Sequence, residues 1–216
     1  MSTLYSVGQM NQLGDALEAE GFTLDDVTKL KQFSNLAGIR GVINGLAKIV
    51  SIVEDATQVI TINKTTIVVN LGASPKLPFN GAEVEQHIGA GWGIVEKRAD
   101  GLYMDDHKII MHLSKHQMGN KWLKGYELRE ELTGMPVLNA NLLDALYQNI
   151  HLIPEGWKRG EDGNICFVFF WGSIFRVSRG FLSVRCLCFD DGKWRSLYRW
   201  LDVDWLGDSP AAVRAS

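Results

Sequence analysis

The chain has 216 residues, of which 46% are hydrophobic and 22% charged, a composition typical of globular proteins rather than disordered or fibrous ones. Its formal net charge is −3, and residues 156–216 carry only nine basic against seven acidic side chains. Nucleic acid is therefore disfavoured as a partner, because neutralising several phosphates requires a strong basic excess.

Residues 1–56 predict a helical N-terminal segment. Helical spacing relates the apolar residues Met10, Leu13 and Leu17. Further helices are expected downstream, the last of them over 36–50. Three short helices joined by tight turns suit a packing or docking bundle, and they also suit a helix-turn-helix that contacts DNA. The third helix offers only Arg40 and Lys48 as basic contacts, which favours the bundle.

From residue 57 the pattern changes to β-branched alternation. Residues 59–62 and 65–69 predict a hairpin around Asn63-Lys64. Residues 72–93 are rich in glycine and proline but lack the spacing of a phosphate-binding motif, so we expect a loop there. A short strand is expected over 109–113.

Two helices and three strands are predicted in the second half of the chain. The helices are expected at 125–132 and 139–149, and the strands at 165–176, 181–189 and 194–201. Asp190-Asp191-Gly192 is typical of a tight hairpin turn, in which both central residues need a positive φ. The run 166–171 is apolar without alternation, which indicates a strand covered on both faces. We expect both helices to pack on the three strands as one core.

The third of these strands has two different faces. Trp194, Ser196, Tyr198 and Trp200 have one parity, and Arg195, Leu197 and Arg199 have the other. Side chains alternate between the faces of a strand, so we expect the aromatic residues to be buried and the arginines and Leu197 to point outward.

No recognisable catalytic motif is present, and we expect no catalysis and no cofactor. Cys186 and Cys188 would point to one face of a strand, either as small buried hydrophobes or as a metal-binding pair. His112 and His116 lack the glutamate of a zinc-protease motif, and a strand would separate them by roughly 13 Å. We expect no metal site. The odd cysteine count, the absence of a signal-peptide pattern and the absence of an apolar run of about 18 residues predict a cytoplasmic protein without a membrane span or disulfides.

The C-terminal segment resembles a known family. The stretches Phe169-Phe170-Trp171-Gly172-Ser173, Gly192-Lys193-Trp194, Trp200-Leu201 and Pro210-Ala211-Ala212-Val213 are similar to a group of bacterial proteins, many from small-genome lineages. The ending also resembles the variable (target) proteins of diversity-generating retroelements, in which template-directed mutagenesis changes chosen codons near the C-terminus of a C-type-lectin-like fold. The Gly-Gly-Ser-Trp signature of many such domains is absent, and Gly192-Lys193-Trp194 is the nearest equivalent.

The resemblance implies a fixed scaffold that carries diversified, ligand-binding positions. The scaffold would be Trp194, Tyr198, Trp200, Leu201 and Pro210. The diversified positions would be Arg195, Leu197, Arg199, Asp202, Val203, Asp204, Trp205, Leu206, Gly207 and Asp208, and all of these except Gly207 are expected to bind the ligand. Rigid aromatic residues and arginine on such a scaffold parallel an antibody paratope. The alternative is that residues 194–205 form only a final hairpin with a solvated face.

The sequence therefore predicts an α+β protein. A helical N-terminal segment (1–56) would precede a C-type-lectin-like domain (57–216) with two helices and a C-terminal antiparallel sheet. The expected function is binding of a protein or other macromolecular ligand. The alternative is a phage- or prophage-type regulator that contacts nucleic acid through the N-terminal helices.

Overall fold

The computed structural model describes residues 6–19, 23–24, 59–119, 121–160, 162–177 and 179–215. The chain divides into two compact units, Met1–Gly45 and Leu46–Ser216. We expected a boundary between residues 56 and 57, which lies outside the described residues, as does the helix expected over 36–50.

The described part of the first unit contains helix α1 (Val7–Ala19), which confirms the predicted N-terminal helix. Its start is fixed by a reciprocal pair of hydrogen bonds. Gln9 N donates to Ser6 Oγ at 3.2 Å, and Ser6 N donates to Gln9 Oε1 at 3.0 Å. This capping box satisfies two backbone donors at the first turn. None of the helices in the described ranges is long and apolar enough to cross a bilayer.

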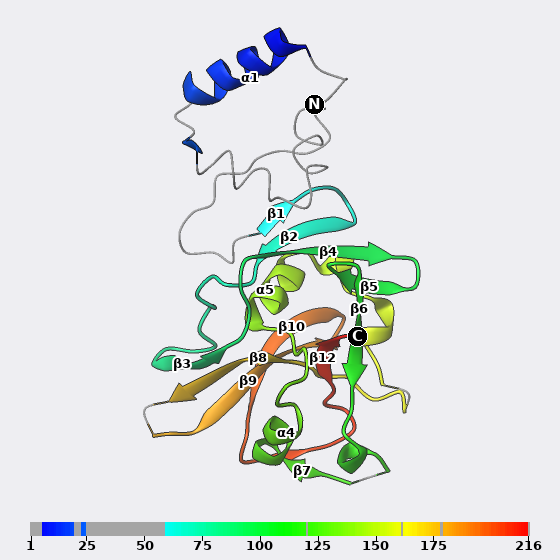
Figure 1. Ribbon diagram of the computed structural model, residues 1–216. Helices are drawn as coiled ribbons and strands as arrows, with labels where there is room; N and C mark the ends of the chain where they lie inside the picture. Colours follow the sequence, from blue (N-terminus) through cyan, green and yellow to red (C-terminus); the bar gives the residue numbers. More distant parts are fainter. Residues whose placement is uncertain are drawn as a thin grey trace. The chain divides into compact units, whose positions relative to one another are not determined.

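The second unit is α+β and consists of a large, curled, mostly antiparallel sheet with helices packed against it (Figure 1). In the described residues the main path of the sheet runs β1-β2-β4-β5-β6-β12-β8-β9-β10, and β3 pairs with β8. The strands of this sheet are β1 (Val59–Thr61), β2 (Thr66–Asn70), β3 (Ala82–His87), β4 (Trp92–Arg98), β5 (Gly101–Met104), β6 (His107–His112), β8 (Val168–Val177), β9 (Leu182–Asp190), β10 (Lys193–Trp200) and β12 (Ala211–Arg214). A second, two-stranded sheet joins β7 (Leu123–Lys124) and β11 (Asp204–Trp205). The helices are α4 (Gly125–Glu131) and α5 (Ala140–Gln148), with 3-10 turns η1 (Lys115–Gln117), η2 (Ile150–Leu152) and η3 (Glu155–Trp157).

Most of the elements expected after residue 57 are confirmed. The hairpin around Asn63-Lys64 forms between β1 and β2, and β6 covers most of the strand expected over 109–113. Helices α4 and α5 and strands β8, β9 and β10 lie where the sequence predicts them. The β9–β10 turn has the two positive φ values that the Asp-Gly pattern predicts, 50° at Asp191 and 73° at Gly192.

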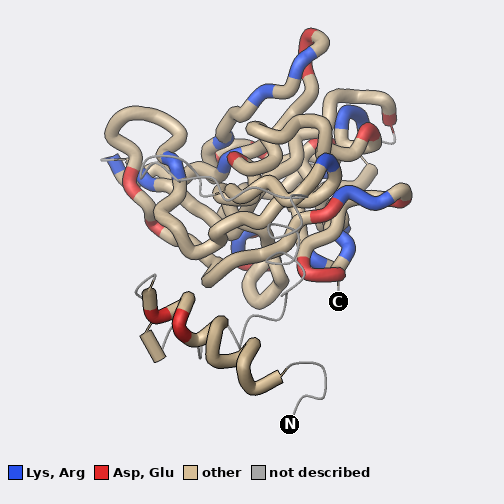
Figure 2. The backbone as a smooth tube through the Cα atoms, turned by 90° about the horizontal axis from the view of Figure 1, so that it is seen from above, with Lys and Arg blue, Asp and Glu red and all other residues tan. Residues whose placement is uncertain are grey.

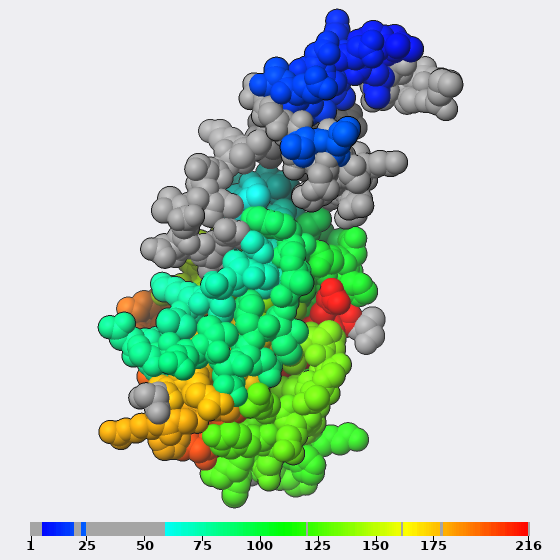
Figure 3. Space-filling model, turned by 60° about the vertical axis from the view of Figure 1, so that its left-hand side comes forward, coloured from blue at the N-terminus to red at the C-terminus, as the bar shows by residue number. Residues whose placement is uncertain are grey.

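Residues 72–93 are not simply a loop, and that expectation is wrong. They contain β3, which pairs antiparallel with β8 and lies against the β8–β9 hairpin in Figure 3. Ala82 is buried, whereas Glu83, Val84 and Glu85 are exposed, so burial does not alternate along β3. Its Glu85 pairs with Arg176 of β8, with Oε2 2.8 Å from Nε. The alternation of apolar and polar residues covers only positions 82–85 of a stretch rich in glycine and proline, so it is a weak strand signal in the sequence.

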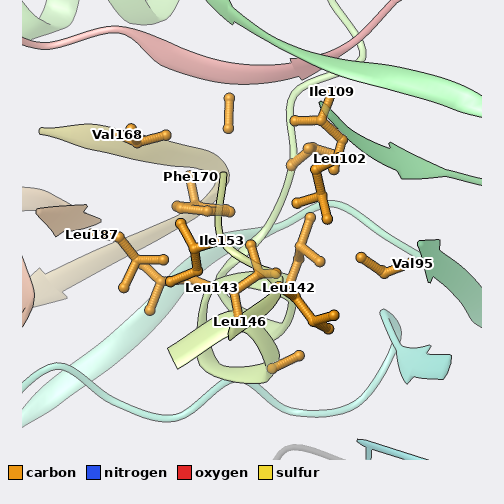
Figure 4. Close-up of a cluster of buried hydrophobic side chains, with 14 of the residues drawn as sticks. Val95, Leu102, Ile109, Leu142, Leu143, Leu146, Ile153, Val168, Phe170 and Leu187 are labelled. Carbon is orange, nitrogen blue, oxygen red and sulfur yellow. The ribbon is translucent and has the colours of Figure 1, made fainter. Parts of the chain in front are cut away.

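Helix α5 is buried from Ala140 to Leu146 and forms the centre of the larger core. Its leucines Leu142, Leu143 and Leu146 lie among apolar side chains that reach them from several strands (Figure 4). These side chains include Val95, Leu102, Ile109, Val168, Phe170 and Leu187. We name this cluster the α5 core.

A second cluster, the α4 core, lies on the opposite face of β8 and β9. Val168 and Phe170 of β8 belong to the α5 core, whereas Phe169 and Trp171 pack with Leu128 of α4. Successive residues of a strand point to opposite faces, so the two helices cover different sides of the same strands. The expected single core is therefore wrong, and the two cores explain why the run 166–171 is apolar without alternation.

The N-terminus of α5 is held by side chains from distant parts of the chain. Asn139 caps the helix, with Leu142 N donating to its Oδ1 at 3.2 Å. The same side chain donates through Nδ2 to Leu71 O at 2.8 Å and to Ile88 O at 3.0 Å. Ala140 N donates to Ser173 Oγ of β8 at 2.9 Å. Buried helix ends need such partners because water cannot reach their backbone groups.

A buried ion pair ties α5 to β9 and β10. Arg185 donates from Nη2 to Asp144 Oδ1 at 2.6 Å and from Nη1 to Asp144 Oδ2 at 2.8 Å, and both side chains are 6% exposed. Further donors reach Ser196 Oγ at 2.9 Å and Lys76 O at 3.1 Å. The pair therefore satisfies its charges and also fixes the 72–81 connection.

Removing one member of this pair should destabilise the protein more than replacing both members with apolar residues. Arg185→Met or Asp144→Leu leaves an unpaired buried charge, and we expect each to lower the free energy of unfolding by about 3–5 kcal/mol. The double variant should lose less than either single one, because apolar replacement of a whole buried pair is often near neutral. Urea unfolding followed by circular dichroism measures all three. Costs that simply add in the double variant would contradict the coupling.

Candidate functional site

The expected working surface begins on β10, whose residues alternate between the two faces of the sheet. The register places Tyr198 opposite Arg185 and Leu197 opposite Cys186. Directly paired residues of antiparallel strands share a face, so Tyr198 lies on the side of α5 and Leu197 on the side of the α4 core. The two predicted faces of β10 are thus confirmed.

The burial expected for the aromatic face is only partly confirmed. Trp194 is buried in the α5 core, whereas Tyr198 is 41% exposed and Trp200 is half-buried. The cover over this end of β10 comes from Phe79, whose ring centroid lies 4.8 Å from that of Tyr198 and 5.7 Å from that of Trp200. A single ring leaves much of Tyr198 open to solvent, so the expectation that Tyr198 is a buried scaffold residue is wrong.

Arg199 was expected to point outward for ligand binding, but it holds the following loop in place. Its Nη1 donates to Ser209 Oγ at 2.5 Å and lies 3.7 Å from Asp208 Oδ1. The guanidinium also lies over the rings of Phe167, at 5.1 Å, and Trp205, at 5.6 Å, within the range of cation–π attraction. These contacts give Arg199 and Asp208 a structural role at the base of the surface.

Trp205 was expected among the ligand-binding residues, and its side chain is 0% exposed. Its ring centroid lies 4.3 Å from that of Phe169 and 4.8 Å from that of Trp171, inside the α4 core. Trp205 Nε1 donates to Trp200 O at 3.3 Å. A Cβ at Gly125 would lie 2.5 Å from this nitrogen, so glycine is required there. Trp205 anchors the loop and cannot contact a ligand from its buried position.

The other expected residues of the loop do face outward. Asp202, Val203, Asp204 and Leu206 are exposed, and Leu197 is 44% exposed on the same side of the sheet. Arg195 is half-buried at the other end of β10, with Nε 3.3 Å from Asp190 Oδ2.

A segment that the sequence analysis missed borders this loop. Strand β7 pairs with β11, so that Lys124 lies opposite Asp204, and Gln117 Nε2 donates to Leu206 O at 2.9 Å. Between these two contacts the segment exposes Met118 and Trp122. In the sequence, the available signal is the presence of Met118 and Trp122 in an otherwise polar, glycine-containing stretch. We name the exposed residues Leu197, Asp202, Val203, Asp204, Leu206, Met118 and Trp122 the C-terminal surface.

The two segments of this surface carry opposite charges. Residues 115–124 contain three lysines and no acid, and residues 202–208 contain three aspartates and no base. Lys124 Nζ lies 2.6 Å from Asp204 Oδ1, and Asp208 is engaged by Arg199. An ion pair thus joins the two segments, and Lys124, Asp204 and Asp208 are paired within the protein.

Ser173 and His87 lie within hydrogen-bond distance, as a nucleophile and its general base would. His87 Nδ1 lies 2.8 Å from Ser173 Oγ, and His87 Nε2 lies 2.9 Å from Leu71 O. A carbonyl accepts only, so Nε2 carries the proton and Nδ1 accepts from the serine. Ser173 is fully buried and its Oγ also accepts from Ala140 N, so no substrate can reach it. The pair supports the N-terminus of α5.

Asp105 and Asp106 form the tight turn between β5 and β6, directly before His107. Asp105 and Asp106 have φ values of 49° and 65°, and their carboxylates bind Ile94 N and Arg98 respectively. His112 ends β6, and His116 belongs to η1. Within the described ranges no group of three or more histidine, cysteine or acidic side chains is placed to hold a metal ion.

The three cysteines, Cys166, Cys186 and Cys188, are buried thiols. Burial raises the pKa of all three, that of Cys166 to about 12. They therefore remain protonated at neutral pH. The thiolate, which is the form that attacks electrophiles or binds metals, is disfavoured at these positions. Their role is to fill the interior.

Comparison of the chain with protein-family models, with curated proteins and with solved structures finds no match. The C-terminal surface is therefore interpreted from its own geometry. Its outward residues surround the buried side chain of Trp205.

The buried anchor Trp205 and the outward residues of this surface should differ in how much their substitution lowers stability. Trp205→Ala removes a fully buried indole, and we expect the free energy of unfolding to fall by about 3–5 kcal/mol. Leu197→Ser changes an exposed position and should shift it by no more than about 0.5 kcal/mol. Chemical denaturation of both variants beside the unmodified protein measures the difference. Equal losses would show that Leu197 belongs to the core.

Proposed function

We propose that the chain is a ligand-binding protein whose C-terminal surface binds a protein or other macromolecular ligand, without catalysis. The observation that carries this proposal is the pattern of the last loop. Exposed Val203 and Leu206 flank the fully buried Trp205, and Leu197 is exposed on the same side of the sheet. Outward residues on a buried anchor can vary without unfolding the core, as in an antibody paratope.

The proposal includes a C-type-lectin-like fold for the second unit and a place among the variable proteins of diversity-generating retroelements. Two features support the fold. Helices α4 and α5 precede the antiparallel strands β8, β9 and β10, and β12 pairs antiparallel with β6. The second pairing joins the end of the chain to a strand that precedes both helices, so the unit is closed on itself.

The chemistry of the surface favours a macromolecular partner. Met118, Trp122, Val203 and Leu206 are large apolar side chains left open to solvent around two loops. Lys121 and Asp202 add exposed charges of both signs beside them. Aromatic and apolar residues with a polar margin are typical of protein interfaces.

The alternative, contact with nucleic acid through the N-terminal helices, gains no support from α1. The helix carries Asp15 and Glu18 and has no basic residue, as the charge colouring of Figure 2 makes visible. Neutralisation of phosphates requires lysine or arginine at the contact. The ligand-binding proposal therefore rests on the second unit alone.

A triple substitution tests the C-terminal surface. Leu197→Ser, Val203→Ser and Leu206→Ser together should leave thermal stability nearly unchanged, because exposed positions shift it by about 0.5 kcal/mol or less each. The same change should weaken ligand capture about 100-fold, since each interface side chain of this kind contributes about 1 kcal/mol or more. Quantitative pull-down from an extract of the encoding organism, followed by titration of the captured partner, gives the measurement.

The matched control makes the same type of substitution at exposed apolar residues elsewhere on the second unit. Val84, Ile110 and Ile150 are exposed apolar residues outside the C-terminal surface. Changing these three to serine removes a similar apolar area and should leave capture intact. Capture that survives the first triple change, or fails equally in the control, would move the working surface away from residues 197–206.

The proposed relationship to diversity-generating retroelements makes a separate genetic prediction. The DNA that flanks the gene should contain a reverse transcriptase gene and a near-copy of the codons for residues 194–209. The copies should differ mainly at codons for outward positions such as Leu197, Val203 and Leu206, and should agree at Trp205, because its burial leaves no room for substitution. Sequencing of the locus in several isolates provides the comparison. Loci without such a copy would exclude diversification but not binding.

A further inference from the structure

A pocket of about 290 Å³ opens on the second unit, away from the residues of the C-terminal surface. It lies between the 88–92 loop, the β5–β6 turn, the stretch 136–139 before α5, and Arg214 at the end of β12. Ligand pockets in proteins start at roughly 300 Å³, so this one suits a small molecule rather than a peptide chain.

The pocket is apolar inside and at its mouth. Met104 and Leu138 line it from within and are buried members of the α5 core. Ile88 and Trp92 line its opening and are largely exposed. An aromatic ring at the mouth and a floor that reaches the core together provide a complementary surface for an apolar group.

The loop that forms one wall is held in a fixed shape. Gly89 has a φ of 148°, and a Cβ there would collide with Asn139 Nδ2, so only glycine allows the loop to approach this side chain. Asn139 Nδ2 in turn binds Ile88 O, and Leu71 N donates to Gly91 O at 2.8 Å. The pocket is therefore pre-formed, which lowers the entropic cost of binding.

The opposite wall carries one charge of each sign. Arg214 Nη1 lies 3.9 Å from Asp105 Oδ2, too far for a hydrogen bond, and both side chains remain about 40% exposed. Asp105 Oδ1 accepts from Ile94 N at 2.9 Å, which orients the carboxylate and leaves Oδ2 available. The guanidinium of Arg214 has five N–H donors and can bind the carboxylate of a ligand.

We propose that this pocket binds a free α-amino acid with an apolar or aromatic side chain. The ammonium group would bind Asp105 Oδ2, the carboxylate would bind Arg214, and the side chain would enter the apolar space between Trp92 and Leu138. Only a zwitterion meets both charges of the wall favourably. A simple anion is repelled by Asp105, and a simple amine is repelled by Arg214.

Three probes separate the contributions of the two charges in the unmodified protein. Isothermal titration should detect binding of phenylalanine. Phenylpropionate lacks the ammonium group and phenethylamine lacks the carboxylate, so each should bind at least about 10-fold more weakly, the loss expected for one charged hydrogen-bonding partner.

Two conservative variants assign each loss to its residue. Asp105→Asn keeps an acceptor for Ile94 N and tolerates the positive φ, and Arg214→Gln keeps a donor without the charge. Both should weaken phenylalanine binding at least about 10-fold, and Asp105→Asn should not weaken phenylpropionate binding. Arg176→Gln is the matched control, because Arg176 is similarly exposed and paired with Glu85 outside the pocket; it should leave phenylalanine binding unchanged.

Three results would overturn the proposal. The first is the absence of saturable phenylalanine binding at millimolar concentration. The second is phenylpropionate or phenethylamine binding as tightly as phenylalanine. The third is unchanged phenylalanine affinity in Arg214→Gln or Asp105→Asn when circular dichroism shows that the variant is folded.

Discussion

The burial of helix α5 inside a curled sheet is the constraint on which the second unit depends. The first turn of a helix leaves backbone donors without partners, and here water cannot satisfy them. Asn139 and Ser173 do so, and Asn139 also binds the carbonyl groups of Leu71 and Ile88. Satisfying the helix therefore fixes the loop that forms a wall of the pocket. Further along, the Asp144–Arg185 pair fixes β9 and the 72–81 connection in the same way.

This arrangement leaves the opposite face of β8 and β9 to be covered by α4 and by the end of the chain. Trp205 completes that cover, packed between Phe169 and Trp171, and Arg199 closes it from the side of β10. The loop around Trp205 is thus fixed by the core beneath it rather than by its own hydrogen bonds alone. Its exposed residues contribute little to the fold, and for that reason they are free to serve recognition.

Local signals in the sequence predict most of the helices, strands and turns. They do not predict which side chains are covered by distant parts of the chain. The residues Asp191-Gly192 predict the β9–β10 turn because this turn depends only on local backbone conformation. The exposure of Tyr198 depends on Phe79, more than a hundred residues earlier, and the partial burial of Arg199 depends on the return of the chain at Ser209. Trp205 is buried between exposed neighbours in a two-residue strand, too short for any periodicity to show. The β3 strand is hard to predict because the apolar–polar alternation of residues 82–85 is short and lies in a stretch rich in glycine and proline.

The charges of the C-terminal surface bear on how a partner could be recognised there. Lys124 is engaged by Asp204 and Asp208 by Arg199, so these charges are already paired within the protein. A partner gains little by meeting them, because it would have to replace contacts that already exist. The surface also presents the exposed charges of Lys121 and Asp202, the apolar area of Trp122, Val203 and Leu206, and two loops joined by the pairing of β7 with β11. Affinity at such a site rests on shape and apolar burial, and both change when a single outward side chain is replaced while the anchor stays the same.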